Sequence, residues 1–447
     1  MSDDTDGQRL TTTASADESK ERRRERPVPG LVLLYADRRA TLRVFRAGAE
    51  SIEIGRVELA PGDVLDGMIS RKHVRVSFDL EFRIEDLSSL NGTFVGGRRI
   101  SGEARAAAGT PVRVGGAVLL CAADVLPFER YGAGLRGEFV EGPALRRALE
   151  IARAATEAEA TLLIEGESGT GRGLVARAFH DAGATAAGPL HVVECAALPR
   201  ECAEALLFGS THDAFPGAVE AEGHAHAAAG GTLFLDEVCE LTPDVQKKLL
   251  RLLEARELVR AGGTVAERVA LRVCASSSRP LRGEVNAGRF RQDLYVRLAR
   301  PELRLPPLRE RLEEVPWHVQ QALEAHATAE QPQRLVSASF IEACLSRPWP
   351  GNVRELRAEL DRAVAAATAE GSLSLSAEDL SPTAGRPRPK GTAVVRFPED
   401  DVAKALMLEA GNVLGAARRL GVHRNKVRRW LERHHVDAGA FKRRSSV

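Results

Sequence analysis

The segment "TLLIEGESGTGRGLVARAFH", Thr161–His180, indicates the fold class of the largest part of the chain. An apolar run is followed by a glycine-rich turn and then by apolar residues at helical spacing. Such a turn presents free backbone amides at the positive end of a helix dipole. The pattern therefore predicts an α/β domain with a parallel sheet and a phosphate loop. Its candidate nucleotide-binding residues are Gly166, Glu167, Ser168, Gly169, Thr170, Gly171, Arg172 and Gly173.

The end of this loop departs from the usual pattern, in which Lys is followed by Ser or Thr. Here Arg172 and Gly173 occupy those positions. Arg keeps the positive charge, but its planar guanidinium makes the exchange non-conservative. Downstream, the apolar run "GGTLFLDE" ends in Asp236 and Glu237, a pair that can hold Mg²⁺ and polarise a water molecule. We therefore expect a phosphate-bearing ligand and Mg²⁺ at this loop.

Composition shifts divide the 447 residues into further parts. Runs in which every second residue is apolar predict a β-sandwich, and alternating strand and helix patterns predict an α/β core. A stretch rich in Pro and Gly predicts a linker. We expect a disordered arm (1–29), a β-sandwich (30–127), an α/β domain (138–380, with a helices-only lid after about 310), a linker (381–398), a short helical unit (399–437) and a basic tail (438–447).

The net charge of +1 excludes a uniformly basic or acidic protein, but residues 401–447 carry 11 Lys+Arg against 4 Asp+Glu, or +7. Aromatic residues make up only 4%, which argues against base-stacking platforms. No apolar run approaches the roughly 18 residues of a membrane span, and the six cysteines form no C-x-x-C pair. We expect a cytoplasmic protein that does not contact membranes.

Three short clusters in the sandwich stand at turns beside strands, where binding residues tend to lie. They are "GR" (Gly55–Arg56), "SRKH" (Ser70–His73) and "SSLNGT" (Ser88–Thr93). A phosphate group needs a guanidinium, hydroxyls and amides that converge on it, and these clusters contain all three. Taken alone, the Asn-Gly of the third cluster would predict only a hairpin turn.

Together the clusters resemble the forkhead-associated (FHA) domain, a phosphothreonine-binding sandwich, over Leu31–Leu126. The resemblance implies that Arg56 and Ser70 hold the phosphate, and that Asn91 binds the peptide backbone with help from Arg71. A phosphothreonine protein would then be a partner. The alternative is an FHA fold that serves only as an intramolecular contact surface.

Between Phe139 and Leu380 the chain resembles the AAA+ domain of sigma-54-dependent activators, the bacterial enhancer-binding proteins. The resemblance rests on "GESGTGRG", "ECAALP", "LFGSTHDAFPGA", "GGTLFLDE", "GRFRQDLYVRL", "LPPLRER" and "WPGNVREL" in that order. It implies ATP and Mg²⁺ as cofactors, with ATP hydrolysed between subunits of a hexameric, homo-oligomeric ring that remodels sigma-54 RNA polymerase. The implied roles are Mg²⁺ coordination by Asp236, water activation by Glu237, action on the neighbour's ATP by Arg291 and Arg297, and γ-phosphate sensing by Arg354.

Four functional positions depart from this family. They are the loop cation (Arg172), the Asn thought to restrain the catalytic Glu (Glu194), the polymerase-contacting GAFTGA loop and the sensor Asn (Ser278). The contacting loop is Asp213, Ala214, Phe215, Pro216, Gly217 and Ala218. Changes at four separate points on an intact scaffold indicate relaxed catalytic demand.

The stretch "AGNVLGAARRLGVHRNKVRRWLERHHV" has the layout of a helix-turn-helix, with a glycine turn between two helical patterns. It resembles the Fis-type domain that ends sigma-54 activators. The resemblance implies that double-stranded DNA is contacted by Arg424, Asn425, Lys426, Arg428 and Arg429. The alternative is a solvated basic helical hairpin.

These patterns predict a multidomain chain of β-sandwich (FHA), α/β P-loop AAA+ domain with helical lid, and all-α helix-turn-helix. The function expected is DNA-binding transcription regulation, responsive to phosphothreonine, with impaired ATP hydrolysis and impaired sigma-54 contact. Two alternatives remain: a fully active ATPase that opens sigma-54 promoters, and a non-catalytic scaffold. The oligomer expected is between a dimer and a hexamer.

Overall fold

The structure is a computed structural model that describes residues 26–59, 67–137, 139–157, 161–214, 217–327 and 335–387. Near the C-terminus it describes residues 402, 405–406, 408–409, 412–420, 427–428 and 431. The expected arm up to residue 25, most of the linker and the basic tail therefore lie outside the described residues. The chain forms two compact units, Met1–Arg386 and Pro387–Val447.

The N-terminal domain is the predicted β-sandwich. Its elements are β1 (Gly30–Ala36), β2 (Arg39–Arg46), β3 (Ile52–Ile54), α2 (Arg56–Leu59), β4 (Val74–Phe78), β5 (Phe82–Asp86), β6 (Thr93–Val95), β7 (Arg98–Arg99), β8 (Glu103–Ala106), β9 (Pro111–Val114), β10 (Ala117–Ala122) and α3 (Leu126–Tyr131). One sheet has the order β2-β1-β10-β9-β6-β7 and the other β3-β4-β5-β8. Alternate residues such as Leu31, Leu33, Phe82 and Ile84 fill the space between the sheets.

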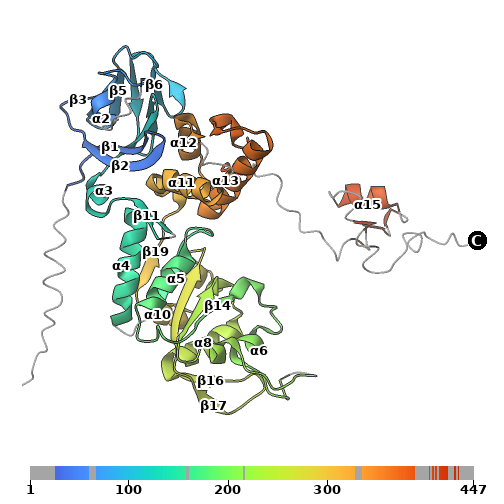
Figure 1. The fold of residues 1–447 in the computed structure, drawn as a ribbon. Helices are drawn as coiled ribbons and strands as arrows, with labels where there is room; N and C mark the ends of the chain where they lie inside the picture. The colour runs from blue at the N-terminus through green and yellow to red at the C-terminus, as the bar shows by residue number, and fades with distance from the viewer. Residues whose placement is uncertain are drawn as a thin grey trace, which may run out of the picture. The chain divides into compact units, whose positions relative to one another are not determined.

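The α/β core is built on a five-stranded sheet in the order β14-β15-β18-β13-β19, in which neighbouring strands run parallel. Its elements are β11 (Gly134–Arg136), β12 (Phe139–Glu141), α4 (Pro143–Glu157), β13 (Leu162–Glu165), α5 (Arg172–Asp181), β14 (Leu190–Glu194), α6 (Ala203–Phe208), α7 (His224–Ala227), β15 (Thr232–Asp236), α8 (Pro243–Ala255), β16 (Glu257–Val259), β17 (Ala266–Arg268), β18 (Arg272–Ser277), α9 (Leu281–Asn286), α10 (Gln292–Leu298) and β19 (Glu302–Arg304). Helices α4 and α5 pack on one sheet face and α6, α8 and α10 on the other (Figure 1).

This sandwiched arrangement explains the near-continuous apolar strands that the sequence shows, because both faces of a parallel sheet are covered by helices. In β13, Leu162 and Ile164 contact α4 and α5, while Leu163 faces the other helical layer. The carboxyl ends of the strands consequently bring the phosphate loop after β13 and the carboxylates after β15 to the same edge of the sheet.

The lid contains α11 (Val315–Ala325), β20 (Leu335–Val336), α12 (Ala338–Leu345), α13 (Asn352–Ala369) and β21 (Ser374–Leu375). The lid is not helices only, since β20 and β21 pair in parallel. Residues 381–387, expected to begin the linker, pack on the lid, where Trp349 donates a backbone hydrogen bond to Gly385. Arg347 adds side-chain hydrogen bonds to the carbonyls of Ser381 and Ala384, so the lid continues past residue 380.

In the C-terminal unit, α15 (Val413–Arg419) begins with Asn412, whose side chain accepts hydrogen bonds from the amides of Leu414 and Gly415. A small core contains Val402, Ala405, Leu406, Ala416, Ala417, Val427 and Leu431. Of the expected DNA-contacting residues, the structure describes only Arg428, which is exposed. Arg424, Asn425, Lys426 and Arg429 lie outside the described residues, and the helix-turn-helix stays a prediction. Among the described residues, no helix is both long and apolar enough to span a membrane.

Candidate functional site

The phosphate loop, Gly166–Gly173, connects β13 to α5. Helix α5 begins at Arg172, and its N-cap Gly171 has a φ of 101° and no side-chain cap. Gly169 also has a positive φ, and a Cβ there would lie 2.4 Å from the carbonyl oxygen of Gly351. A Cβ at Gly171 or Gly173 would meet open space. The loop thus leaves room for an anion beside the first-turn amides of α5.

The guanidinium of Arg172 turns toward the carboxylates after β15. Its Nη2 donates to Glu237 Oε1 at 2.6 Å and lies 3.1 Å from Asp236 Oδ1. Its Nη1 donates to the carbonyl oxygen of Gly166 at 2.9 Å. The side chain is only 7% exposed, so this cation is held within the loop by three acceptors.

Glu237 has a left-handed backbone, with φ 60° and ψ 51°, and both of its carboxylate oxygens have partners. Ser278 donates to Oε2 from its amide at 2.9 Å and from its hydroxyl at 2.8 Å. Burial raises the pKa of this carboxyl, but the hydrogen bonds from Ser278 and Arg172 outweigh burial and leave the pKa below its usual value. Glu237 is therefore an ionised, anchored carboxylate. Glu194 is exposed at the end of β14, in register with Asp236.

Residues of the lid and of the segment before it also bond to the phosphate loop, at Glu167 and Ser168. The Nδ2 of Asn352, which is fully buried, donates to Glu167 Oε2 and to the carbonyl of Ser168, both at 3.1 Å. Arg309 pairs with both oxygens of Glu167 at 2.9 and 2.8 Å. The predicted sensor Arg354 donates to Ser168 Oγ at 2.8 Å.

Sequence reasoning assigned only Arg354 and missed Arg309 and Asn352, although both lie in motifs it used. It also missed Arg311, which is 1% exposed and donates to the carbonyl of Thr170 at 2.9 Å. The available signal was weak, because "LPPLRER" and "GNVREL" show only that basic and amide side chains occur there.

Asp236 and the loop glycines fit a magnesium nucleotide in part. Asp236 offers a carboxylate at the carboxyl end of β15, and its Oδ1 accepts a hydrogen bond from Ser276. The second protein ligand usual in phosphate loops is a hydroxyl, and Gly173 has none at that position. The residues present can therefore supply one of the two customary protein ligands for Mg²⁺.

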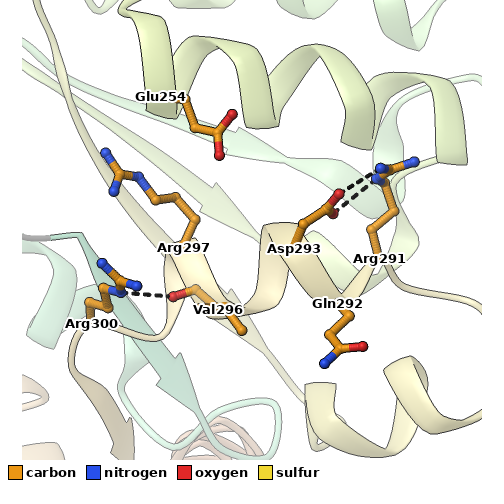
Figure 2. A pocket seen from close by; sticks show the side chains of 7 residues that line it. All are labelled: Glu254, Arg291, Gln292, Asp293, Val296, Arg297 and Arg300. Atoms are coloured by element: carbon orange, nitrogen blue, oxygen red, sulfur yellow. Dashed lines mark hydrogen bonds and ion pairs between the residues drawn. The ribbon is translucent and has the colours of Figure 1, made fainter.

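A second candidate site is a hollow of about 680 Å³ beside α10, which we call the arginine hollow. It brings together the predicted Arg291 and Arg297, and adds Arg300 and Glu254, which sequence reasoning missed (Figure 2). Arg291 is paired with both oxygens of Asp293 at 3.0 and 2.6 Å. The three guanidiniums share the hollow with the two carboxylates of Glu254 and Asp293, so its lining has a net charge of +1 and its guanidiniums are the groups that could accept an anion.

Of the loop expected to contact sigma-54, the structure describes Asp213, Ala214, Gly217 and Ala218, whereas Phe215 and Pro216 lie outside the described residues. The base of this loop is closed by a bridge between Ser210 and Ala221. Asp213 and Gly217 are exposed, and Ala218 is buried.

In the sandwich, Arg56 at the start of α2 lies close to loops that carry Ser70, Arg71 and Asn91, and we call these four residues the phosphopeptide edge. Arg56 donates from its amide to Ser70 O at 3.1 Å and from Nε to Ile69 O at 2.8 Å. Ser70 Oγ accepts from the amide of Leu90 at 3.2 Å, and Asn91 Nδ2 donates to Met68 O at 2.9 Å.

Two structural residues keep these loops together. The amide of Ser70 donates to Nδ1 of the buried His73, whose Nε2 lies 3.3 Å from Gly92 O. A Cβ at Gly55 would lie 1.9 Å from Arg71 O, so only glycine allows this approach. The edge therefore presents a guanidinium, a hydroxyl and an amide within one small area.

Comparison with known proteins gives a consistent assignment. Sequence profiles of three families match the chain: the Sigma-54 interaction domain over residues 139–304, the AAA+ ATPase lid domain over 309–394 and the FHA domain over 52–115. The chain is 38% identical to the transcriptional regulatory protein ZraR of Klebsiella oxytoca over 319 residues, which span 69% of this chain and 71% of that protein.

The chain belongs to the family of sigma-54-dependent transcriptional regulators. It is also 37% identical to the Nif-specific regulatory protein of Azotobacter vinelandii over 290 residues, 65% of this chain and 55% of that protein. The structure resembles NtrX from Brucella abortus in complex with ADP, with a TM-score of 0.51 and 28% identity over 68% of this chain and 70% of that one. The family match confirms the FHA and AAA+ assignments made from the sequence.

Proposed function

We propose that this family member is a DNA-binding transcription regulator that reads phosphothreonine through its FHA domain. Its AAA+ domain binds ATP and assembles as a homo-oligomer, but hydrolyses ATP slowly and contacts sigma-54 RNA polymerase weakly. The observation that carries the proposal is the 2.6 Å hydrogen bond from Arg172 to Glu237.

Slow hydrolysis follows from what that hydrogen bond occupies. A general base must orient and polarise the attacking water, and the loop cation must stabilise charge on the phosphates. Here Arg172 and Ser278 occupy the two oxygens of Glu237, and the guanidinium faces carboxylates. Because Arg forms a planar fork of donors where Lys is a compact ammonium, it can remain bonded to Glu237 and Asp236 together.

Nucleotide binding is supported by the loop itself. The glycines, the first-turn amides of α5 and Asp236 are all in place, and the similar NtrX was crystallised with ADP and with ATP. We infer that Asp236 would hold Mg²⁺ beside the phosphates, where the ion would neutralise phosphate charge. The arginine hollow is suited to the phosphates of a nucleotide held by a neighbouring subunit.

Weak contact with sigma-54 polymerase is inferred from the loop sequence. Pro216 replaces a Thr, which removes a hydroxyl and a backbone N–H donor, and Asp213 replaces a Gly. The phosphopeptide edge supports phosphothreonine binding, since its donors converge as phosphate recognition requires. The +7 charge of residues 401–447 supports contact with DNA phosphates.

The test is reconstituted transcription with the full chain, sigma-54 polymerase and an enhancer-bearing promoter, with ATP or a non-hydrolysable analogue. We expect calorimetry to show nucleotide binding and mobility shifts to show DNA binding. We expect little promoter opening with either ATP or the analogue. Strong ATP-dependent promoter opening would reject slow hydrolysis and weak contact with sigma-54 polymerase. Absence of DNA binding would favour a non-catalytic scaffold protein.

One observation favours the alternative of an active ATPase. Asp236, Glu237, Arg291 and Arg297 all retain the family's residue types, and the last two line one hollow. If oligomerisation or nucleotide binding moves Arg172 away from Glu237, the same residues could complete a composite catalytic site. The turnover of the purified oligomer at saturating ATP distinguishes the two functions.

A further inference from the structure

Strand β1 of the FHA domain is buried on both of its faces. Leu31 and Leu33 lie in the core of the sandwich, whereas Val32 and Leu34 belong to a hydrophobic cluster with residues of the AAA+ lid. Val118 and Leu120 of β10 join the same cluster. The outer face of an antiparallel sheet is normally polar when it meets water. This outer face, which we call the docking face, is instead apolar and covered by the lid.

Polar contacts fix the register of this docking. The hydroxyl of Tyr35 donates to the carbonyl of Val336 at 2.6 Å, and burial raises the pKa of that phenol. Glu342 on α12 uses both carboxylate oxygens, accepting from the amide of Gly97 at 3.0 Å and from Arg113 Nε at 2.6 Å. The side chains of Arg113 and Glu342 are 17% and 6% exposed, so this is a largely buried ion pair.

The same contacts reach toward the phosphopeptide edge. The guanidinium of Arg113 stacks 3.6 Å from the centre of the Phe94 ring. Phe94 lies in β6, three residues after Asn91, and Gly97 lies in the turn that follows β6. Lid contacts fall on this turn and on the docking face, while Arg56 and Asn91 both donate to carbonyls of a different segment, Met68–Ile69. A ligand on the edge and a docked lid can therefore coexist.

At the end of α12 away from the FHA domain's contacts, residues that follow the helix contact the phosphate loop. Trp349, fully buried after α12, donates from Nε1 to the carbonyl of Cys344 at 2.8 Å. Three residues later, Asn352 accepts from the amide of Leu308 at 2.7 Å and donates to Glu167 and Ser168 in the loop. One continuous set of packed and hydrogen-bonded residues thus joins β6 to the phosphate loop.

We propose that the AAA+ lid is the docking partner of the FHA domain, and that Glu342 is a positioning residue that links the phosphopeptide edge to the phosphate loop. The FHA fold then has both roles that the sequence left open, recognition at its edge and an intramolecular contact on its sheet. The part concerning phosphopeptide rests on the proposed phosphothreonine binding. The part concerning the lid does not.

The first experiment needs no ligand. Hydrogen–deuterium exchange of the full chain compares wild type with Glu342→Gln and with Tyr35→Phe, which deletes one hydrogen bond without leaving a charge unpaired. Glu370→Gln, an exposed carboxylate at the end of α13, is the matched control. We expect exchange about tenfold or more faster in peptides covering 94–99 and 166–172 in Glu342→Gln, since it removes a charge-assisted contact. In Tyr35→Phe we expect a smaller increase. Wild-type exchange at 166–172 in both folded variants overturns the proposal.

The second experiment adds a phosphothreonine peptide. In wild type we expect the peptide to change exchange at 166–172 as well as at the edge, and in Glu342→Gln only at the edge. A peptide that binds wild type without altering 166–172 overturns the linkage. A peptide that does not bind rejects phosphothreonine recognition instead, and the ligand-free comparison still decides whether docking positions the loop.

Discussion

The guanidinium of Arg172 donates a 2.6 Å hydrogen bond to Glu237, 65 residues later in the chain. A residue expected on the nucleotide phosphates is thus bonded to the residue expected to activate water. Ser278 donates to the second oxygen of the same carboxylate at 2.8 Å from its hydroxyl. Two of the four departures, Arg172 and Ser278, therefore converge on one carboxylate.

Arg172→Lys should raise ATP turnover by about ten- to a hundredfold. A hydrogen bond to a charged group is worth about 1.5–3 kcal/mol, and each 1.36 kcal/mol corresponds to about a tenfold rate. Steady-state phosphate release measures the effect. Adding Glu237→Gln to Arg172→Lys should abolish the gain, and equal rates for wild type and Arg172→Lys would show that the contact with Glu237 does not limit hydrolysis.

The arginine hollow should act on a neighbouring subunit. In an Arg172→Lys background, chains carrying Arg297→Ala and chains carrying Glu237→Gln should each be nearly inactive. Mixing them should restore part of the turnover, because some sites then combine an intact Glu237 with a neighbour's intact Arg297. Phosphate release from titrated mixtures provides the measurement. If ATP turnover does not recover at any mixing ratio, Arg297 acts within its own subunit or takes no part in hydrolysis.

Arg56→Ala should weaken binding of a phosphothreonine peptide by at least about tenfold, because a charge-assisted hydrogen bond to phosphate is lost. Fluorescence anisotropy with phosphorylated and unphosphorylated forms of one peptide measures this. Arg83→Ala, an exposed arginine on β5, is the control and should bind as wild type. Equal affinity for the two peptide forms would remove phosphothreonine recognition.

His318 should make the lid sensitive to acid. Burial lowers its pKa from 6.5 to about 3, helped by the charges of Arg357 and Arg311, and neither ring nitrogen has a hydrogen-bond partner. A lowered pKa means that the unfolded chain binds the proton first. The free energy of unfolding is therefore not reduced by His318 above pH 6.5. It falls as the pH drops from 6.5 toward 3, because the unfolded chain takes up the proton first.

Between pH 7.5 and pH 5 this loss amounts to about 2 kcal/mol. His318→Leu should remove that part of the pH dependence with little cost at pH 7.5, since it replaces a buried imidazole whose nitrogens form no hydrogen bond and whose Nε2 lies 4.0 Å from Glu314 Oε2. Urea unfolding at both pH values measures the difference. His212→Leu, at an exposed histidine, should follow wild type; a His318→Leu chain that loses as much stability as wild type contradicts the assignment.

Arg428→Ala should reduce the salt dependence of DNA binding by about one unit in the slope of log K against log salt, if Arg428 neutralises one phosphate. Mobility shifts from low to moderate salt give the slope. Arg200→Ala, an exposed arginine of the α/β core, should leave the slope unchanged. Identical slopes for wild type and Arg428→Ala would show that Arg428 does not contact a DNA phosphate.

The phosphate loop, the sandwich and the positions of the family departures could all be predicted from the amino-acid sequence. These features are encoded in contiguous residues, since a glycine turn after Leu162–Glu165 and before an apolar helical pattern has few other conformations. Apolar period-two runs likewise predicted the strands of the sandwich, because sheet burial alternates along each strand.

The directions in which the side chains of those residues point follow from the three-dimensional packing and not from any local pattern. Arg172 could have faced a phosphate or a carboxylate, and it is the packing of β15 beside β18 that brings Glu237 and Ser278 to it. No sequence pattern shows that the lid covers the apolar outer face of β1, or that Glu342 bonds to Arg113 and Gly97 there. Contacts across 65 to 245 residues depend on the arrangement of whole elements, which no local pattern encodes.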